Sequence, residues 1–215
     1  MNKHETKIFI VDDDEEVRQS LSLLLKSAGY QTESFPHIGQ FLNMENYNGE
    51  GCILLDVFLG GKTGLELQAE IETKFESLPI IFITGQGNIP MSVEAMKNGA
   101  LNFLQKPIDD KELFTAIGEA LSRSNALITK QNEIEKFKSL VNSLSAREYE
   151  IFRYVIAGIL NKQIAAELEI AEHTVKNHRL NITEKLGVKS VPEMIYIAEK
   201  LNIKGASVKN HFNLL

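Results

Sequence analysis

Five polar residues that could build a cation and phosphoryl site follow apolar runs in the first half of this 215-residue chain. They supply three carboxylates, one hydroxyl and one ammonium group: Asp12, Asp13, Asp56, Thr84 and Lys106. If the runs are strands of one parallel sheet, these side chains emerge at the edge where open α/β sheets bind ligands. Carboxylate oxygens suit Mg²⁺, and a lysine ammonium suits phosphate oxygens. The residue types therefore predict a site for a hard cation and a transferred phosphoryl group.

The elements that must position these side chains are short and strongly apolar. Their continuous rather than alternating apolarity predicts strands covered on both faces, as in a parallel sheet between helices. Helical patterns lie between them, and the clearest, from Val17 to Ala28, ends at Gly29. This alternation predicts an α/β flavodoxin-like fold with a five-stranded parallel sheet in the order 2-1-3-4-5. The strand segments are 7–11, 31–35 (the weakest), 52–55, 79–83 and 102–105.

Asp56 is the nucleophile by position, because a carboxylate on the middle strand can attack phosphorus in line while a metal neutralises the developing charge. Asp12 and Asp13 then hold the metal. Without it three like charges are crowded together, which should raise the pKa of one carboxyl group. The alternative for the aspartate pair is a helix N-cap with an acidic first turn, spanning residues 13–16.

Residues 1 to about 124 resemble the receiver domain of two-component response regulators, and residues 83–107 are especially similar to the FixJ type. The motifs are IVDDDE (10–15), LDV (55–57), TG (63–64), ITG (83–85), GA (99–100) and FLQKP (103–107). The resemblance implies that Asp56 is the phosphoacceptor and that Mg²⁺ is bound by Asp13, Asp56 and the carbonyl of Phe58, with Asp12 acting through water. It further implies that Thr84 and Phe103 form a switch pair, that Lys106 contacts the phosphoryl group, and that the Lys106–Pro107 peptide is cis.

One departure from this family lies in the loop after Asp56. Gly60 stands where the family usually has proline, and Gly61 follows it. Two glycines loosen the loop, so the departure bears on the rate of phosphorylation and the lifetime of the phosphoryl group more than on the site itself.

The second half of the chain differs in charge and pattern. Residues 1–144 carry a net charge of −8 and residues 145–215 carry +2, which suggests separate partners. Residues 161–170 predict a short helix capped by Asn161, and residues 172–182 predict a second helix after a turn. Two helices joined by such a turn form a helix-turn-helix, whose second helix enters the major groove of DNA. The alternative is an amphipathic helix pair that only builds a core, with its charged residues solvating the surface.

Helical geometry separates the two faces of the second helix. Val175, Ile182 and Leu186 form a buried stripe. On the opposite face, Asn177 could pair with adenine, Lys176 could reach guanine or phosphate, and Leu180 could touch a thymine methyl group; His173 and Glu184 share that face. Arg179 lies nearer the core, where phosphate or an internal acid is its expected partner, and His178 is expected to pack.

Residues 144–201 resemble the DNA-binding domain of the LuxR/NarL type. The motifs are LSARE (144–148), AG (157–158), NK (161–162), TVK (174–176), His178 and KLGV (185–188). The resemblance implies that Lys176, Asn177 and Leu180 face the groove, while Lys162, Thr174 and Lys185 are candidates for backbone contacts. Ala171 replaces the usual serine N-cap, which should cost about 1 kcal/mol, partly offset by Glu172 at the positive helix end.

The sequence thus divides into a receiver domain (1–124), a helical linker (125–143) and a DNA-binding domain (144–215). The linker contains no proline or glycine, so it predicts a helix continuing from the receiver. Two apolar stripes have open roles. The first, Ile134, Phe137, Val141 and Leu144, fits a coiled coil or packing on either domain; the second, Val191, Met194, Ile195, Ala198 and Leu201, closes the small domain or pairs two copies. Residues after Ile203 predict a frayed tail, in which Phe212, Leu214 and Leu215 are unexplained.

Cys52, the only cysteine, forms no internal disulfide, and the sequence has no signal peptide or membrane-length apolar run, so we expect a cytoplasmic protein without membrane contact. The expected function is that of a FixJ/NarL-type response regulator, not an enzyme. A histidine kinase phosphorylates Asp56, and homodimers then bind double-stranded DNA and regulate transcription, with RNA polymerase as a candidate further partner. The rivals are a DNA-binding regulator with a phosphorylation-independent dimerisation scaffold, and a phosphatase with an aspartate nucleophile. Phosphatases resembling haloacid dehalogenases need a second aspartate where this chain has Phe58.

Overall fold

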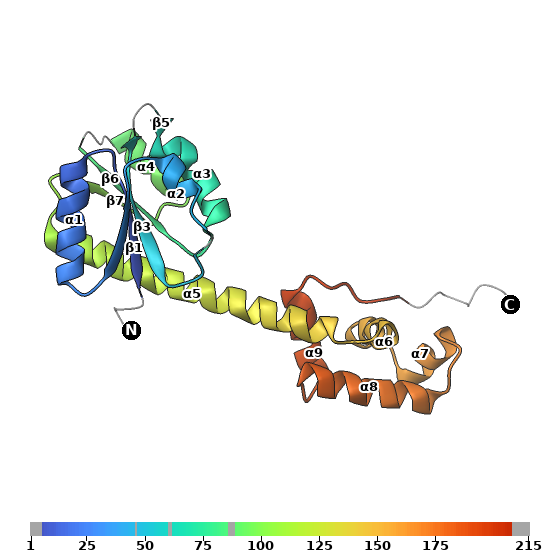
Figure 1. Cartoon of the computed structure of the whole chain (residues 1–215). Helices are drawn as coiled ribbons and strands as arrows, with labels where there is room; N and C mark the ends of the chain where they lie inside the picture. Colours follow the sequence, from blue (N-terminus) through green and yellow to red (C-terminus); the bar gives the residue numbers. More distant parts are fainter. Residues whose placement is uncertain (1–5, 46, 60–61, 86–88, 208–215) are drawn as a thin grey trace. The chain divides into compact units, whose positions relative to one another are not determined.

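The computed structural model describes residues 6–45, 47–59, 62–85 and 89–207, and the chain divides into two compact units, Met1–Lys130 and Gln131–Leu215. The first unit alternates strands and helices (Figure 1). Its elements are β1 (Lys7–Val11), α1 (Glu15–Ser27), β2 (Gln31–Phe35), α2 (Ile38–Leu42), β3 (Gly51–Asp56), β4 (Phe58–Leu59), β5 (Lys62–Thr63), α3 (Gly64–Lys74), β6 (Ile80–Thr84), α4 (Ile89–Lys97), β7 (Asn102–Gln105) and the first part of α5 (Asp110–Asn142).

The main sheet of the first unit has the order β2-β1-β3-β6-β7, and all its neighbouring strands are parallel. This is the predicted flavodoxin-like order, so the fold expectation is confirmed. The register pairs Val11 with Leu55 and Asp56 with Ile83. The carboxyl ends of β1, β3 and β6 therefore meet at one edge, which brings together residues far apart in the sequence. Strands β4 and β5 form a separate antiparallel pair, and Gly60 and Gly61 lie outside the described residues.

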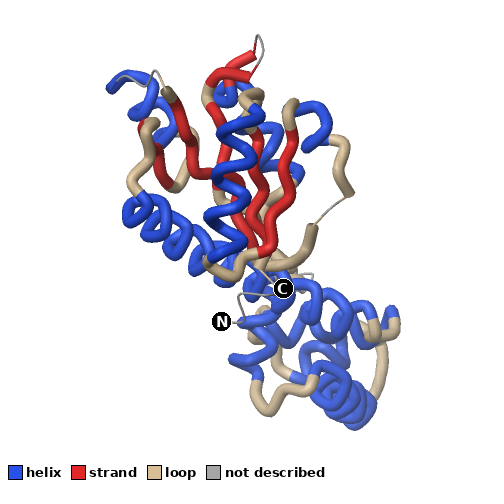
Figure 2. Tube along the Cα trace, turned by 60° about the vertical axis from the view of Figure 1, so that its left-hand side comes forward, coloured by secondary structure: helices blue, strands red, loops and turns tan. Residues whose placement is uncertain are grey.

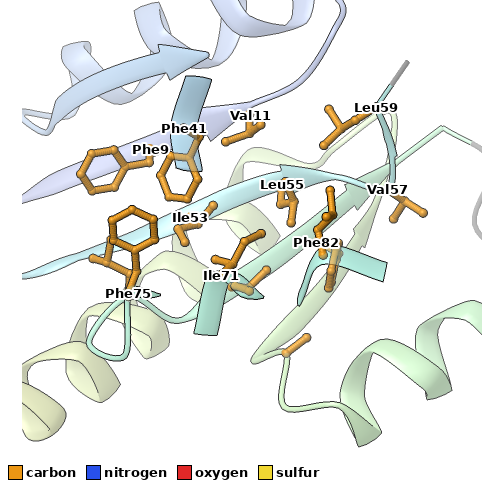
Figure 3. Packing of buried hydrophobic residues seen from close by; sticks show 14 of the residues in the cluster. Phe9, Val11, Phe41, Ile53, Leu55, Val57, Leu59, Ile71, Phe75 and Phe82 are labelled. Atoms are coloured by element: carbon orange, nitrogen blue, oxygen red, sulfur yellow. The ribbon is translucent and has the colours of Figure 1, made fainter. Parts of the chain in front are cut away.

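Apolar side chains cover both faces of this sheet, as the continuous apolar runs predicted. Along β1, Phe9 and Val11 pack with α2, α3 and α4, while Ile8 and Ile10 pack with α1 and α5. Figure 3 shows the first of these layers, where the ring of Phe41 lies between those of Phe9 and Phe75. The ring centroid of Phe41 lies 5.8 Å from that of Phe9 and 4.7 Å from that of Phe75. In Figure 2 the strands, drawn in red, lie between blue helices. Strands β3 and β6 are buried along their whole length, and each ends in a polar residue of the predicted site, Asp56 and Thr84.

The second unit is helical and consists of the end of α5 with α6 (Ala146–Ile156), α7 (Asn161–Glu167), α8 (Glu172–Leu186) and α9 (Val191–Lys200). The helix predicted to continue from the receiver is confirmed as α5, which runs without a break to Asn142. Phe137, Val141 and Leu144 of the linker stripe pack into the core of this second unit, as one of the alternatives expected, whereas Ile134 is not in that core. Of the described helices, none is long and apolar enough to cross a membrane.

Two details of the second unit correct the sequence reading. The N-cap of α7 is Leu160 rather than Asn161, and the cap hydrogen bond is supplied by Gln163, whose Oε1 accepts from Leu160 N at 3.1 Å. Asn161 is the first helical residue, and its side chain accepts a hydrogen bond from Arg179 of α8 instead of capping α7. In α9, Met194, Ile197 and Ala198 are buried, whereas Ile195 is not in the core; the stripe closes the small unit.

The segment after α9 returns along α6 rather than fraying at Ile203. Ala206 N donates to Arg153 O at 2.9 Å, and Arg153 Nε donates to Lys204 O at 3.0 Å. The tail expectation was therefore wrong for residues 204–206. Phe212, Leu214 and Leu215 lie outside the described residues.

Candidate functional site

Side chains from three strand ends converge at the carboxyl edge of the first unit's sheet. Lys106 Nζ lies 2.6 Å from Asp12 Oδ2 and 3.0 Å from Asp56 Oδ1. One carboxylate oxygen each of Asp12, Asp13 and Asp56 falls within 4.8 Å of the others. Asp12 and Asp56 are buried and Asp13 is exposed, so the acidic cluster opens to solvent on one side. The structure thus brings together four of the five residues singled out from the strand ends, and the fifth, Thr84, is buried at the end of β6.

Backbone groups fix the orientation of these carboxylates. Asp56 Oδ2 accepts from Phe58 N at 2.9 Å, and Asp12 Oδ1 accepts from Asp14 N at 2.9 Å. The N-cap of α1 is Asp14, which accepts from the amides of Glu16 and Val17. Capping therefore occupies Asp14, and Asp13 makes no hydrogen bond or ion pair with any described residue. The N-cap expected within the acidic run is therefore Asp14, and the metal role of Asp12 and Asp13 stays a prediction.

The acidic groups of the site outnumber the basic group paired with them, and the pKa values of Asp56 and Lys106 are both raised. Burial raises the pKa of Asp56, and Asp12 raises it further, against the opposing hydrogen bond and charge of Lys106. Burial lowers the pKa of Lys106, but hydrogen bonds to Asp12 and Asp56 outweigh it, so that pKa is raised. Among the described residues, Lys106 is the ion-pair partner of two of the three carboxylates, Asp12 and Asp56. The donor set fits a hard divalent cation, because such ions take carboxylate and carbonyl oxygens and keep some of their water.

Thr84 and Phe103 lie on neighbouring strands beside this cluster. Thr84 O accepts from Lys106 N at 2.8 Å, which ties the end of β6 to the residue after β7. Phe103 is partly buried, and its ring centroid lies 6.4 Å from that of Phe82. The Lys106–Pro107 peptide is cis, as expected. The side chain of Phe58 is exposed, and the metal role of its carbonyl stays a prediction.

Helix α8 of the second unit has the two faces expected of it. Val175, Ile182 and Leu186 are fully buried, and Lys176, Asn177 and Leu180 are exposed. Leu180 is 59% exposed, an unusual position for a leucine on a helix with an available core. His173 and Glu184 are also exposed, and Thr174 is partly buried. Lys162, at the start of α7, is exposed. An exposed face of this composition can make hydrogen bonds and apolar contacts with base edges.

Ion pairs and hydrogen bonds divide the basic residues of this unit into two groups. Lys176 makes only an exposed pair with Glu172, at 3.2 Å, which leaves it available to a ligand. Lys185 instead lies 2.6 Å from Glu148 Oε2, whose side chain is buried. Arg179 Nη1 donates to Asn161 Oδ1 at 2.6 Å, so its internal partner is an amide and not the expected acid, and a phosphate contact stays a prediction.

Glu148 is the residue of this unit that the sequence reading missed. It is 4% exposed, its Oε2 accepts from Ser145 N at 2.8 Å, and Lys185 is its ion-pair partner. These contacts lower the pKa of Glu148 to about 2, the hydrogen bond from Lys185 contributing most. The signal was present, because Ser145 and Glu148 have the spacing of a capping box. The partner on α8 had no such signal.

Comparisons with known proteins identify a family for each half of the chain. Residues 8–118 match the response regulator receiver domain family, and residues 142–197 match the bacterial regulatory proteins of the luxR family. The response regulator protein TmoT of Ectopseudomonas mendocina is 41% identical over 201 residues, 94% of this chain and 91% of that protein. The transcriptional regulatory protein FixJ of Bradyrhizobium diazoefficiens is 35% identical over 89% of this chain and 93% of its own.

Solved structures give the same result. The structure of the response regulator StyR is 40% identical, covers 91% of this chain and 99% of its own, and superposes with a TM-score of 0.78. Full-length FixJ from B. japonicum is 33% identical and covers 92% of this chain and 97% of its own, with a TM-score of 0.52. This chain belongs to the response regulator family of transcriptional regulators, with a receiver domain followed by a LuxR-type DNA-binding domain.

Proposed function

We propose that phosphorylation of Asp56 by a sensor histidine kinase switches this regulator to its DNA-binding form. The observation that carries the proposal is the convergence of Asp12, Asp56 and Lys106 within hydrogen-bond distance at one sheet edge, with Asp13 beside them. We assign residues 1–124 to the receiver, 125–143 to the linker and 144–215 to DNA binding, and we place the regulator in the cytoplasm, where its DNA target lies.

In the reaction, a carboxylate oxygen of Asp56 forms a bond to phosphorus as the bond to the kinase histidine nitrogen breaks, and that nitrogen keeps the electron pair. Lys106 is held by two carboxylates and can follow the transferred phosphoryl oxygens as a point charge. Mg²⁺ bound by Asp12, Asp13, Asp56 and the Phe58 carbonyl would neutralise charge on the phosphoryl group. The raised pKa of Asp56 reflects how poorly this pocket tolerates its own negative charge.

The switch follows from residues next to the pocket. Phosphoryl oxygens draw the Thr84 hydroxyl toward Asp56, and Phe103 on the adjacent strand turns into the space that is vacated. This biases an existing equilibrium toward a homodimer. The dimer places two copies of α8 on paired DNA half-sites, from which RNA polymerase is recruited or excluded. The residues we assign to DNA are Lys162, Thr174, Lys176, Asn177, Leu180 and Lys185.

The experiment is phosphorylation with acetyl phosphate, with and without Mg²⁺, followed by intact mass spectrometry and titration of a selected operator. We expect one Mg²⁺-dependent phosphoryl group and tighter DNA binding in the wild-type chain. Asp56→Asn should lose both, whereas the control Asp14→Asn should keep both, because asparagine also caps a helix. A phosphoryl group retained in Asp56→Asn would overturn the assignment, and DNA binding indifferent to phosphorylation would favour the scaffold alternative.

A further inference from the structure

A polar side chain, Gln68, lies on the inner face of α3 where an apolar residue is expected. Gly64, Leu67 and Ile71 are buried on the same face of the helix, and Gln68 is 1% exposed. Burying an amide is unfavourable unless hydrogen bonds replace those to water. The contacts of this amide therefore show what its burial achieves.

The amide of Gln68 links α3 to the end of α4. Its Nε2 donates to Ala95 O at 3.3 Å and to Glu72 Oε1, one turn along α3, at 2.8 Å. Its Oε1 is buried and accepts from no described residue. Ala95 O lies in the last turn of α4, where helix carbonyls lack partners within the helix, so this bond adds a contact from α3 to that end of α4. The polar contact is thus directed at α4, not at solvent.

Two described residues of α4, Ala95 and the partly buried Met91, pack into the core cluster that contains Leu67 and Ile71 of α3. Ala95 is its one buried residue among those described, whereas Ile89 is 80% exposed and Val93 and Met96 are also exposed. The same Ala95 carbonyl accepts from Ala100 N at 3.1 Å in the turn that leads to β7. The Glu72 carboxylate lies against this turn, since a Cβ on Gly99 would come within 3.0 Å of Glu72 Oε1. Gln68 and Glu72 therefore contact the carboxyl end of α4 and the turn at Gly99 that leads to β7, the strand that carries Phe103.

We propose that Gln68 is the positioning residue of the receiver switch: it fixes the carboxyl end of α4 to α3, so that a change at Thr84 reaches Phe103 by turning α4 about Ala95. This inference rests on the proposed function, in which Thr84 and Phe103 form the switch pair. Helix α4 lies between these two residues in the chain. The exposed amino-terminal part of α4 moves, and the end held by Gln68 does not. Without that fixed point the two switch residues are no longer coupled.

The test compares Gln68→Leu and Gln68→Glu with Gln19→Leu in the full-length chain. Leucine removes the amide. Glutamate keeps the size, and in its ionised form it cannot donate to Ala95 O and is repelled by Glu72. Gln19 is the matched control, because it donates to Glu15 at the same helical spacing, at 2.9 Å, but on the exposed face of α1. Glu72→Gln keeps an acceptor for Gln68 and should behave as wild type.

The first measurement is hydrogen exchange in the unphosphorylated protein. The amides of Gly99 and Ala100, which donate to Met96 O and Ala95 O, should exchange about ten-fold faster in both Gln68 variants and unchanged in the controls. The second is the ratio of dimer dissociation constants without and with acetyl phosphate, which should fall about five-fold or more while phosphorylation of Asp56 stays at the wild-type level.

Exchange at Gly99 and Ala100 that matches wild type in both Gln68 variants would overturn the inference, as would an unchanged ratio of dimer constants. Loss of Asp56 phosphorylation in a folded Gln68 variant would also overturn it, because Gln68 would then act on the pocket. If the wild-type chain itself shows no effect of phosphorylation on dimerisation, the proposed function fails, and hydrogen exchange still decides whether Gln68 holds α4.

Discussion

The two units each contain a lysine that lies 2.6 Å from a buried carboxylate, and the two pairs behave in opposite ways. In the second unit Glu148 has its own lysine, Lys185, and a backbone amide, and its pKa falls to about 2. In the first unit Lys106 is shared by Asp12 and Asp56, and the pKa of Asp56 is raised. A carboxylate with a full set of partners stabilises its fold. For Asp56, burial is the larger cause of the raised pKa, and the shared Lys106 only partly offsets it.

The comparison also separates two ways of building a binding site. At the sheet edge, residues from distant strands meet because parallel strands end together, and their charges are buried and unbalanced. On α8 the groove-facing candidates Lys176, Asn177 and Leu180 come from one exposed helical face, and helical periodicity alone selects them. Substitutions in the pocket should therefore change stability and chemistry together, whereas those on the helix face should change binding alone.

The largest effect is expected for Lys106→Met. Removing the shared ammonium leaves Asp12 and Asp56 buried together without a counter-charge, so the free energy of unfolding of the full chain should fall by about 2–4 kcal/mol at neutral pH. Lys185→Met should cost only about 1–2 kcal/mol, since its partner keeps the Ser145 amide. Urea unfolding with EDTA measures both, with Lys26→Met as an exposed control. Equal losses of unfolding free energy in Lys106→Met and Lys185→Met would contradict the difference that we infer between the two ion pairs.

The next effect concerns the helix face. Asn177→Ala should cost about 1–3 kcal/mol of DNA binding at one base position and relax specificity there, because an asparagine amide can pair bidentately with adenine. The free energy of unfolding should stay at the wild-type value, since Asn177 is exposed. The variant is titrated against a selected operator and its single-base changes. Full base preference in Asn177→Ala would show that this face does not read the groove.

Glu148→Gln sharpens the comparison through pH. The folded pKa of about 2 lies below the unfolded value, so the ion pair stabilises the protein above the unfolded pKa and is lost as pH falls through the folded one. We expect Glu148→Gln to be about 1–2 kcal/mol less stable than wild type at pH 7. The difference should shrink between about pH 5 and pH 2.

Denaturation of both proteins across that pH range measures the effect. Glu150→Gln is the control, because the pair of Glu150 with Arg147 is exposed and should contribute little. A difference between Glu148→Gln and wild type that stays constant down to pH 2 would contradict the assignment of the low pKa to Glu148.

The smallest effect is expected for Lys162→Ala. Lys162 precedes the recognition helix, so its loss should weaken binding to all sequences alike and reduce the salt slope by about one unit per protomer. Titrations at several salt concentrations distinguish this from Asn177→Ala. A base-specific loss in Lys162→Ala would place the residue in the groove rather than on the phosphate backbone.

Much of the site could be read from the sequence because it depends on local patterns. Continuous apolar runs identified β1, β3, β6 and β7, and the residues directly after them converge at one edge. The buried stripe of α8 followed from helical periodicity. The N-cap of α7 was harder to predict, because asparagine is a common N-cap residue and Asn161 lies next to the actual cap, Leu160. The side chain of Asn161 instead accepts a hydrogen bond from Arg179 of α8, which the local sequence does not indicate.

The sequence by itself determined the two-domain character, the strand ends and the exposed face of the recognition helix, since periodicity and strand termini are properties of short segments. Only the tertiary structure decided which charges are satisfied. Lys185 of α8 forms an ion pair with Glu148 of α6, and Lys106 forms ion pairs with two aspartates, Asp12 and Asp56. The buried amide of Gln68 donates to the carbonyl of Ala95 in α4. These partners are set by how elements pack, and no pattern within one element encodes the residue that will face it.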